Sequence, residues 1–177
     1  MDAALQRAGI SIALRISLGG DFYKMRSIKI LVVEDNDADT YYLKTVLDRM
    51  GVVYTMSVLG DGESAVKFLL KRGEYAKAWN PDLIFLDLNL PKLSGVEVLE
   101  ALSPFRRFPF CILTSSPLGR DKLKKEFGIR RIAYVVKPAT RDMLLNCFRC
   151  YDHLAPLAEQ ITVGNLGRDS TPVTLGQ

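Results

Sequence analysis

Apolar residues recur along the chain in short runs, and each run is followed by residues spaced as on one face of a helix. Residues 28–33 are apolar apart from Lys29, and they lead directly into Glu34. A continuous apolar run of this length that ends in polar residues is typical of a buried strand. The next apolar positions follow the i, i+3, i+4, i+7 spacing of a helix that ends at Gly51, and they are Leu43, Val46, Leu47 and Met50.

The same alternation repeats four more times. Strands are predicted at 52–59, 83–86, 110–113 and 132–136, and helices around 65–69, 96–102, 123–127 and 144–151. Thr140 is the expected N-cap of the last helix. Five strands that alternate with five helices predict an α/β fold with a doubly wound parallel sheet, covered by helices on both faces.

The two ends of the chain depart from this pattern. Residues 10–18 alternate as in a strand up to the Gly19-Gly20 pair, so residues 1–26 are predicted to be an extension outside the domain. Alternatives are a start at Met25, an extra edge strand or a dimerisation arm. The domain is predicted at 27–154, and the Pro- and Gly-containing residues 155–177 are predicted to form a flexible tail.

Composition narrows the class of protein. Of the 177 residues 48% are hydrophobic and 25% are charged, which is the balance of a soluble globular chain. No apolar run approaches the roughly 20 residues of a membrane span, and three cysteines imply no disulfide framework, so a reducing, cytoplasmic location is expected. The net charge of +4 includes a basic cluster at 120–131, interpreted as a solvated face, with a docking patch for an acidic partner as the alternative.

Charged and hydroxyl side chains gather where the predicted strands end. Glu34 and Asp35 follow the first strand, Asp87 the third, Thr114 the fourth and Lys137 the fifth. Ligands of such sheets bind beyond the carboxyl ends of the strands. Close carboxylates repel by roughly 4 kcal/mol per pair at an effective dielectric constant near 20, so the group needs a countercharge. Oxygen ligands favour Mg²⁺, and a metal, an ammonium and an attacking carboxylate together suit phosphoryl transfer.

Four segments give this pattern a family likeness. ILVVEDN (30–36), DLIFLDLNLP (82–91), FCILTSS (110–116) and IAYVVKPAT (132–140) resemble the receiver domain of bacterial two-component response regulators. That resemblance implies a flavodoxin-like sheet with strand order 2-1-3-4-5. LDLNLPKLSG (86–95) and RGEY (72–75) are most similar to stand-alone receivers of phytochrome-type sensor kinases.

The resemblance also implies a role for each residue of the site. Asp87 is the expected phosphoacceptor, and Lys137 is expected to contact the phosphoryl group. Mg²⁺ would be held by Asp35, by Asp87, by Glu34 through water and by the backbone carbonyl of Asn89. Switch roles fall to Thr114 and Tyr134, and Pro138 is a candidate for a cis peptide bond.

The expected function is therefore that of a single-domain response regulator rather than an enzyme with a turning-over substrate. A sensor histidine kinase would phosphorylate Asp87, and the signal would pass on by protein contact. A homodimer through the helix 4, strand 5 and helix 5 face is consistent with the resemblance, although the FGIRRIAY segment (127–134) departs from the family pattern on that surface.

Three other functions compete with this expectation. A phosphorylation-independent adaptor or dimerisation module could use the same fold. A phosphohydrolase would need an acidic residue at the position of Asn89. Nucleic-acid binding is disfavoured because the sequence contains no recognisable helix-turn-helix unit.

Overall fold

Five parallel strands form the central sheet of the computed structural model. The structure describes residues 15–18, 21–24, 27–105, 108–115 and 132–166. The sheet comprises β3 (Ile28–Val33), β4 (Tyr54–Leu59), β5 (Leu83–Asp87), β6 (Phe110–Thr114) and β7 (Ala133–Val136). Its spatial order is β4-β3-β5-β6-β7, which is the predicted order 2-1-3-4-5 when the five strands are counted along the chain.

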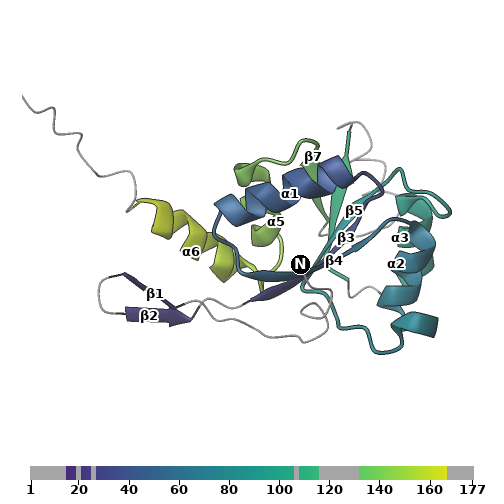
Figure 1. Cartoon of the computed structure of the whole chain (residues 1–177), viewed down its shortest axis with the longest axis horizontal. Helices are drawn as coiled ribbons and strands as arrows, with labels where there is room; N and C mark the ends of the chain where they lie inside the picture. Colours follow the sequence, from purple (N-terminus) through teal and green to yellow (C-terminus); the bar gives the residue numbers. More distant parts are fainter. Residues whose placement is uncertain (1–14, 19–20, 25–26, 106–107, 116–131, 167–177) are drawn as a thin grey trace, which may run out of the picture.

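Helices cover both faces of this sheet. Figure 1 shows α1 and α5 on one face and α2 and α3 on the other. Their bounds are Asp37–Arg49 for α1, Gly62–Leu69 for α2, Gly95–Leu102 for α3 and Arg141–Arg149 for α5, with 3₁₀ turns η1 (Gly73–Tyr75) and η2 (Ser103–Phe105). Thr140 caps α5 as predicted. The predicted fourth helix and the basic cluster at 120–131 lie outside the described residues.

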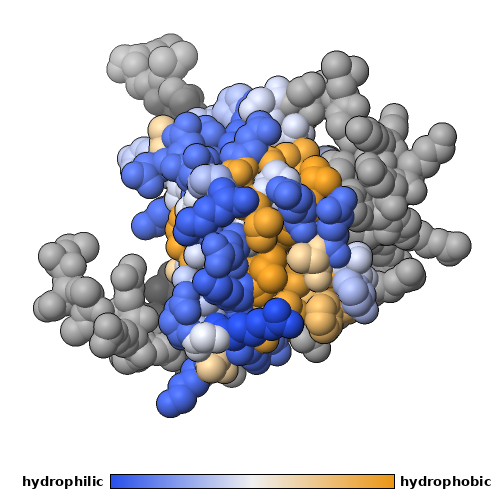
Figure 2. Space-filling view, turned by 90° about the vertical axis from the view of Figure 1, so that its right-hand side faces the viewer, coloured by the Kyte–Doolittle hydropathy of each residue, from blue (hydrophilic) through white to orange (hydrophobic). Residues whose placement is uncertain are grey.

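The sheet divides the apolar core into two halves. One half lies between the sheet and α1, α5 and α6, and Phe148 and Leu144 are fully buried in it. The other lies against α2 and α3. There Trp79 packs edge-on against Phe68, with ring centroids 5.2 Å apart. Several apolar members of this second half are only partly buried, and Figure 2 shows apolar side chains at the surface at the right-hand end of the molecule in Figure 1.

A short hairpin precedes the sheet. Strands β1 (Arg15–Leu18) and β2 (Asp21–Lys24) pair antiparallel and form a two-stranded sheet of their own. The strand-like alternation at 10–18 is confirmed for Arg15–Leu18, and residues 10–14 lie outside the described residues. The alternative of an extra edge strand on the main sheet does not hold for the described pairings. The proposed dimerisation arm remains a prediction.

The C-terminal region contains a helix that the sequence pattern did not predict. Residues 155–166 form α6 (Ala155–Leu166), so the expected flexible tail is wrong for this part of the chain. Pro156 lies in the first turn, where its missing N–H removes no helical hydrogen bond. The helix buries Leu157, Ala158 and Ile161 in the α1–α5 half of the core. Within the described ranges, no helix is long and apolar enough to cross a membrane.

Candidate functional site

The turn after β3 is organised by a single side chain. Asn36 is the N-cap of α1, and its Oδ1 accepts hydrogen bonds from the backbone N–H groups of Ala38 at 2.9 Å and Asp39 at 3.4 Å. The Asn36 N–H in turn donates to Glu34 Oε1 at 3.2 Å. Hydrogen bonds between residues no more than three positions apart therefore fix the start of the helix and help to direct the Glu34 side chain.

The loop after β5 orients Asp87. The Asn89 N–H donates to Asp87 Oδ1 at 3.0 Å, which leaves Oδ2 for other partners. The loop ends in a capping box, in which the Ser94 side chain accepts from the Glu97 N–H and the Glu97 side chain accepts from the Ser94 N–H. Gly95 follows, and a Cβ there would lie 2.2 Å from the Asp87 carbonyl oxygen. The absence of a side chain at Gly95 lets α3 begin directly beside the phosphoacceptor candidate.

The same loop is fastened to the start of α2. A Cβ on Gly62 would lie 2.0 Å from the Leu93 carbonyl oxygen, so only glycine permits this approach. Lys92 Nζ lies 2.8 Å from Asp61 Oδ2, although Lys92 has a backbone φ of 65°. The Lys92 hydrogen bond, followed by that of the Ser64 N–H, lowers the pKa of Asp61 to about 2.

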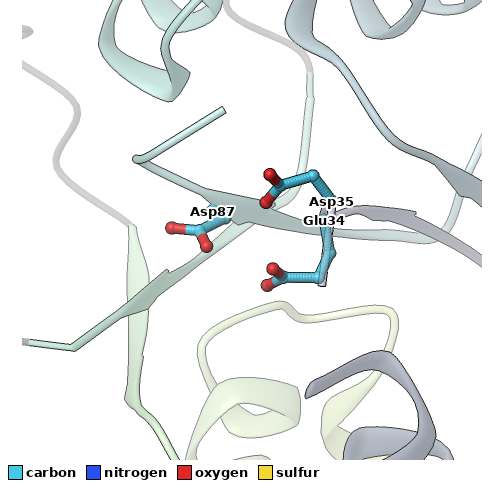
Figure 3. A group of neighbouring side chains, drawn as sticks. All are labelled: Glu34, Asp35 and Asp87. Carbon is cyan, nitrogen blue, oxygen red and sulfur yellow. The ribbon is translucent and has the colours of Figure 1, made fainter. Parts of the chain in front are cut away.

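Three predicted metal ligands converge beyond the strand ends. Carboxylate oxygens of Glu34, Asp35 and Asp87 all lie within 4.8 Å of one another. Figure 3 shows the carboxylate groups gathered at the ends of two neighbouring strands. Glu34 and Asp87 are the buried polar residues of the described core, whereas Asp35 is exposed. The arrangement combines buried anions with one anion open to solvent.

Lys137 contacts two of these carboxylates and a further one on α1. Its Nζ lies 2.5 Å from Asp87 Oδ2, 2.6 Å from Glu34 Oε2 and 3.0 Å from Asp39 Oδ2. The following Lys137–Pro138 peptide bond is cis, as expected. Sequence reasoning missed Asp39, although an acid one helical turn beyond Asp35 was a signal that could have suggested it.

The charges perturb one another. Burial alone would lower the pKa of the Lys137 ammonium, but hydrogen bonds to Asp87, Glu34 and Asp39 outweigh it and raise the pKa well above the usual range. Burial raises the pKa of Glu34; the Lys137 ion pair opposes this rise and the nearby Asp87 charge adds to it. The site therefore contains one firmly protonated ammonium among carboxylates that repel one another.

Thr114 lies on β6, the strand next to β5, and Tyr134 lies on β7, one strand further from the acids. Thr114 ends β6, and its carbonyl oxygen accepts a hydrogen bond from the Lys137 N–H at 2.9 Å. Tyr134 lies on β7 and packs, partly buried, against the α2–α3 half of the core. Both residues thus lie on the two strands nearest to Lys137, and their switch roles remain predictions.

The donor set fits a divalent cation. Carboxylates of Glu34, Asp39 and Asp87 contact the Lys137 ammonium, and the Asp35 carboxylate lies beside those of Glu34 and Asp87. Oxygen donors with excess negative charge are the surroundings that Mg²⁺ or Mn²⁺ prefers.

Comparisons with known proteins agree with this chemistry. A family model for the response regulator receiver domain matches residues 30–149. The response regulator Rcp1 of Synechocystis sp. is 41% identical over 111 residues, which are 61% of this chain and 75% of Rcp1. The Mn²⁺-bound form of Rcp1 has a solved structure that matches with a TM-score of 0.54 and 29% identity, over 85% of this chain and 97% of that one.

Two further solved structures are similar. The bacteriophytochrome response regulator AtBRR matches with a TM-score of 0.64 and 30% identity, over 71% of this chain and 92% of that one. The phosphorylated cyanobacterial phytochrome response regulator RcpA matches with a TM-score of 0.55 and 29% identity, over 85% of this chain and all of that one. Since the family model spans well over half of the sequence and the fold has the same strand order, this chain belongs to the response regulator receiver domain family.

Proposed function

We propose that this chain receives a phosphoryl group on Asp87 from a sensor histidine kinase in a reaction that requires Mg²⁺. The observation that carries the proposal is the position of Asp87. Its carboxylate ends the buried strand β5, lies within 4.8 Å of two other carboxylates and contacts the Lys137 ammonium at 2.5 Å. A carboxylate so placed can attack phosphorus while a cation and an ammonium balance the transferred charge.

Each residue has a part in that reaction. An Asp87 oxygen forms a bond to phosphorus as the bond from phosphorus to the kinase histidine nitrogen breaks. The electron pair of the broken bond returns to that nitrogen, and the imidazole leaves neutral with its proton on the other ring nitrogen. Asp35, Asp87 and the Asn89 carbonyl would hold Mg²⁺ directly and Glu34 through water. The bound ion would supply positive charge to the phosphoryl oxygens. The Lys137 ammonium, which contacts Asp87, would bind an oxygen of the phosphoryl group on Asp87.

The phosphoryl group would then shift an equilibrium between two conformations. The Thr114 carbonyl oxygen accepts a hydrogen bond from the Lys137 N–H, and Tyr134 lies on β7, the strand that leads to Lys137. We infer that Thr114 moves toward the phosphoryl group and that Tyr134 turns further into the core behind it. The changed surface would signal by protein contact, without turnover of a separate substrate.

The relatives indicate the class of kinase. Two of the similar structures are phytochrome response regulators by name. A phytochrome-type sensor histidine kinase is therefore the first donor to test, in a cytoplasmic reaction. Any homodimer would involve the predicted fourth helix, whose residues lie outside those described, together with β7 and α5.

The decisive experiment is phosphorylation by acetyl phosphate with and without Mg²⁺, followed by intact-protein mass spectrometry. The wild type is expected to gain one phosphoryl group only with Mg²⁺, and Asp87→Asn is expected to gain none. Asp82→Asn is a matched control, because Asp82 precedes the same strand at its opposite end. Equal labelling of Asp87→Asn, or no labelling of the wild type by acetyl phosphate or by a kinase, would overturn the proposal and favour the adaptor function.

A further inference from the structure

Lys137 has one partner that belongs to neither of the acidic strand ends. Asp39 lies in the first turn of α1, and its Oδ2 is 3.0 Å from the Lys137 Nζ. The same ammonium lies 2.5 Å from Asp87 Oδ2, so the Asp39 and Asp87 oxygens cannot be farther apart than the sum of these two distances. Asp39 therefore acts on the site through Lys137 and through its own charge.

The partners of Lys137 differ in their access to water. The side chain of Asp39 is 37% exposed, against 1% for Glu34 and 7% for Asp87. An ion pair with an exposed partner adds little to folding stability, because water screens it and the side chains lose freedom. Asp39 is thus a poor candidate for a structural clamp. Its charge, however, lies beside the atoms that receive the phosphoryl group.

A carboxylate at this place favours cation binding and disfavours the approach of the phosphoryl group. It adds negative charge to a cation site that already contains Glu34, Asp35 and Asp87, and it draws Lys137 away from exclusive pairing with Asp87. Both effects favour a divalent cation. The same charge repels the anionic phosphoryl group as it approaches Asp87.

We propose that Asp39 is a positioning residue that shares the Lys137 ammonium with Asp87, raising Mg²⁺ affinity and slowing phosphoryl entry. This inference rests on the proposed phosphorylation of Asp87, which it refines. It assigns to α1 a control over the site that the acidic strand ends alone do not provide.

The test compares Asp39→Asn with Asp37→Asn in the full chain. Asp37 lies in the same helical turn and is exposed, and its replacement removes the same charge without touching Lys137. Asp39→Asn is expected to weaken Mg²⁺ binding about fivefold by titration calorimetry and to speed labelling by acetyl phosphate about fivefold at saturating Mg²⁺. Asp37→Asn is expected to change each quantity less than twofold, and Asp39→Glu to restore the wild-type values in part.

Salt provides a further readout that structural damage would not imitate. Raising the ionic strength should shrink both differences between Asp39→Asn and the wild type, because screening weakens the interaction of a partly exposed charge. This inference would be overturned if Asp39→Asn lost cation binding and labelling together, or if its values equalled those of Asp37→Asn. Labelling of the wild type would still support the proposed function in either case. A wild type that takes up no phosphoryl group would overturn both.

Discussion

The two segments that carry the acids are held in different ways. The turn after β3 depends on Asn36, whose hydrogen bonds reach the near neighbours Glu34, Ala38, Asp39 and Thr40. The loop after β5 depends instead on distant residues, since Gly62 admits the Leu93 carbonyl and Asp61 pairs with Lys92, 31 positions away. The backbone turn of one acidic segment is therefore set by near neighbours, although Lys137 also pairs with its Glu34 and Asp39 side chains, and the loop of the other is set by the helix against which it packs.

The largest effects are expected at the two glycines beside the β5 loop. Gly62→Ala and Gly95→Ala would each gain up to about 1 kcal/mol of helix propensity. The new methyl groups would meet backbone carbonyls at 2.0 and 2.2 Å, and the resulting overpacking is expected to reduce the free energy of unfolding by about 3 kcal/mol. Urea denaturation measures this loss.

Gly60→Ala is the matched control, because nothing lies within 4 Å of the position that its methyl group would occupy. It is expected to be neutral or to stabilise the protein by about 0.5 kcal/mol. Equal stability of all three variants would mean that the loop is not held by close approach to α2 and α3.

A smaller effect is expected from the local turn. Asn36→Ala removes the cap of α1 and should reduce the free energy of unfolding by about 1 kcal/mol. It also releases the turn that directs Glu34, so Mg²⁺ binding should weaken. Asn80→Ala, at an exposed position, is the control and should leave both quantities unchanged. A loss as large as that of Gly62→Ala would contradict the distinction between the two segments.

Acid should weaken the β5 loop through Asp61. Its pKa falls from 3.8 to about 2 on folding, chiefly because Lys92 donates to it. A carboxyl group with a lowered pKa stabilises the fold above its unfolded pKa and loses that contribution as the pH falls from about 4 toward 2. The contribution should be about 1 kcal/mol, since solvent screens the pair.

Asp61→Asn isolates this charge, because asparagine also caps helices well. Unfolding measured between pH 5 and pH 2 should show the wild type converging on the variant as the pH falls and the Asp61 carboxyl group takes up its proton. A difference that stays constant with pH would exclude the ion pair as its source.

The smallest effects concern lysines in the left-handed backbone region. Lys71 and Lys92 have φ values of 55° and 65°, which cost roughly 1 kcal/mol relative to glycine. Lys71→Gly should therefore stabilise the protein, whereas Lys92→Gly should gain less, because it also loses the Asp61 pair. Equal increases in the free energy of unfolding, measured by urea denaturation, would show that the Lys92–Asp61 pair does not stabilise the loop.

These contrasts explain what could be predicted from the sequence. Apolar spacing and capping residues such as Thr140 act over a few positions, so the five strands, the helices α1, α2, α3 and α5 and the strand-end acids were predictable. The ion pair between Asp39 and Lys137 spans 98 positions and depends on how α1 lies against the strand ends. Helix α6 was missed because Pro156 resembles a helix breaker until its place in the first turn is known.

The packing of Trp79 against Phe68 has a practical consequence. Trp79 is the sole tryptophan of the chain, and it belongs to the half of the core under α2 and α3. Its fluorescence emission therefore follows one face of the sheet, and the face under α1, α5 and α6 contributes no indole signal. Unfolding curves from emission and from circular dichroism will coincide only where both faces come apart in one cooperative step.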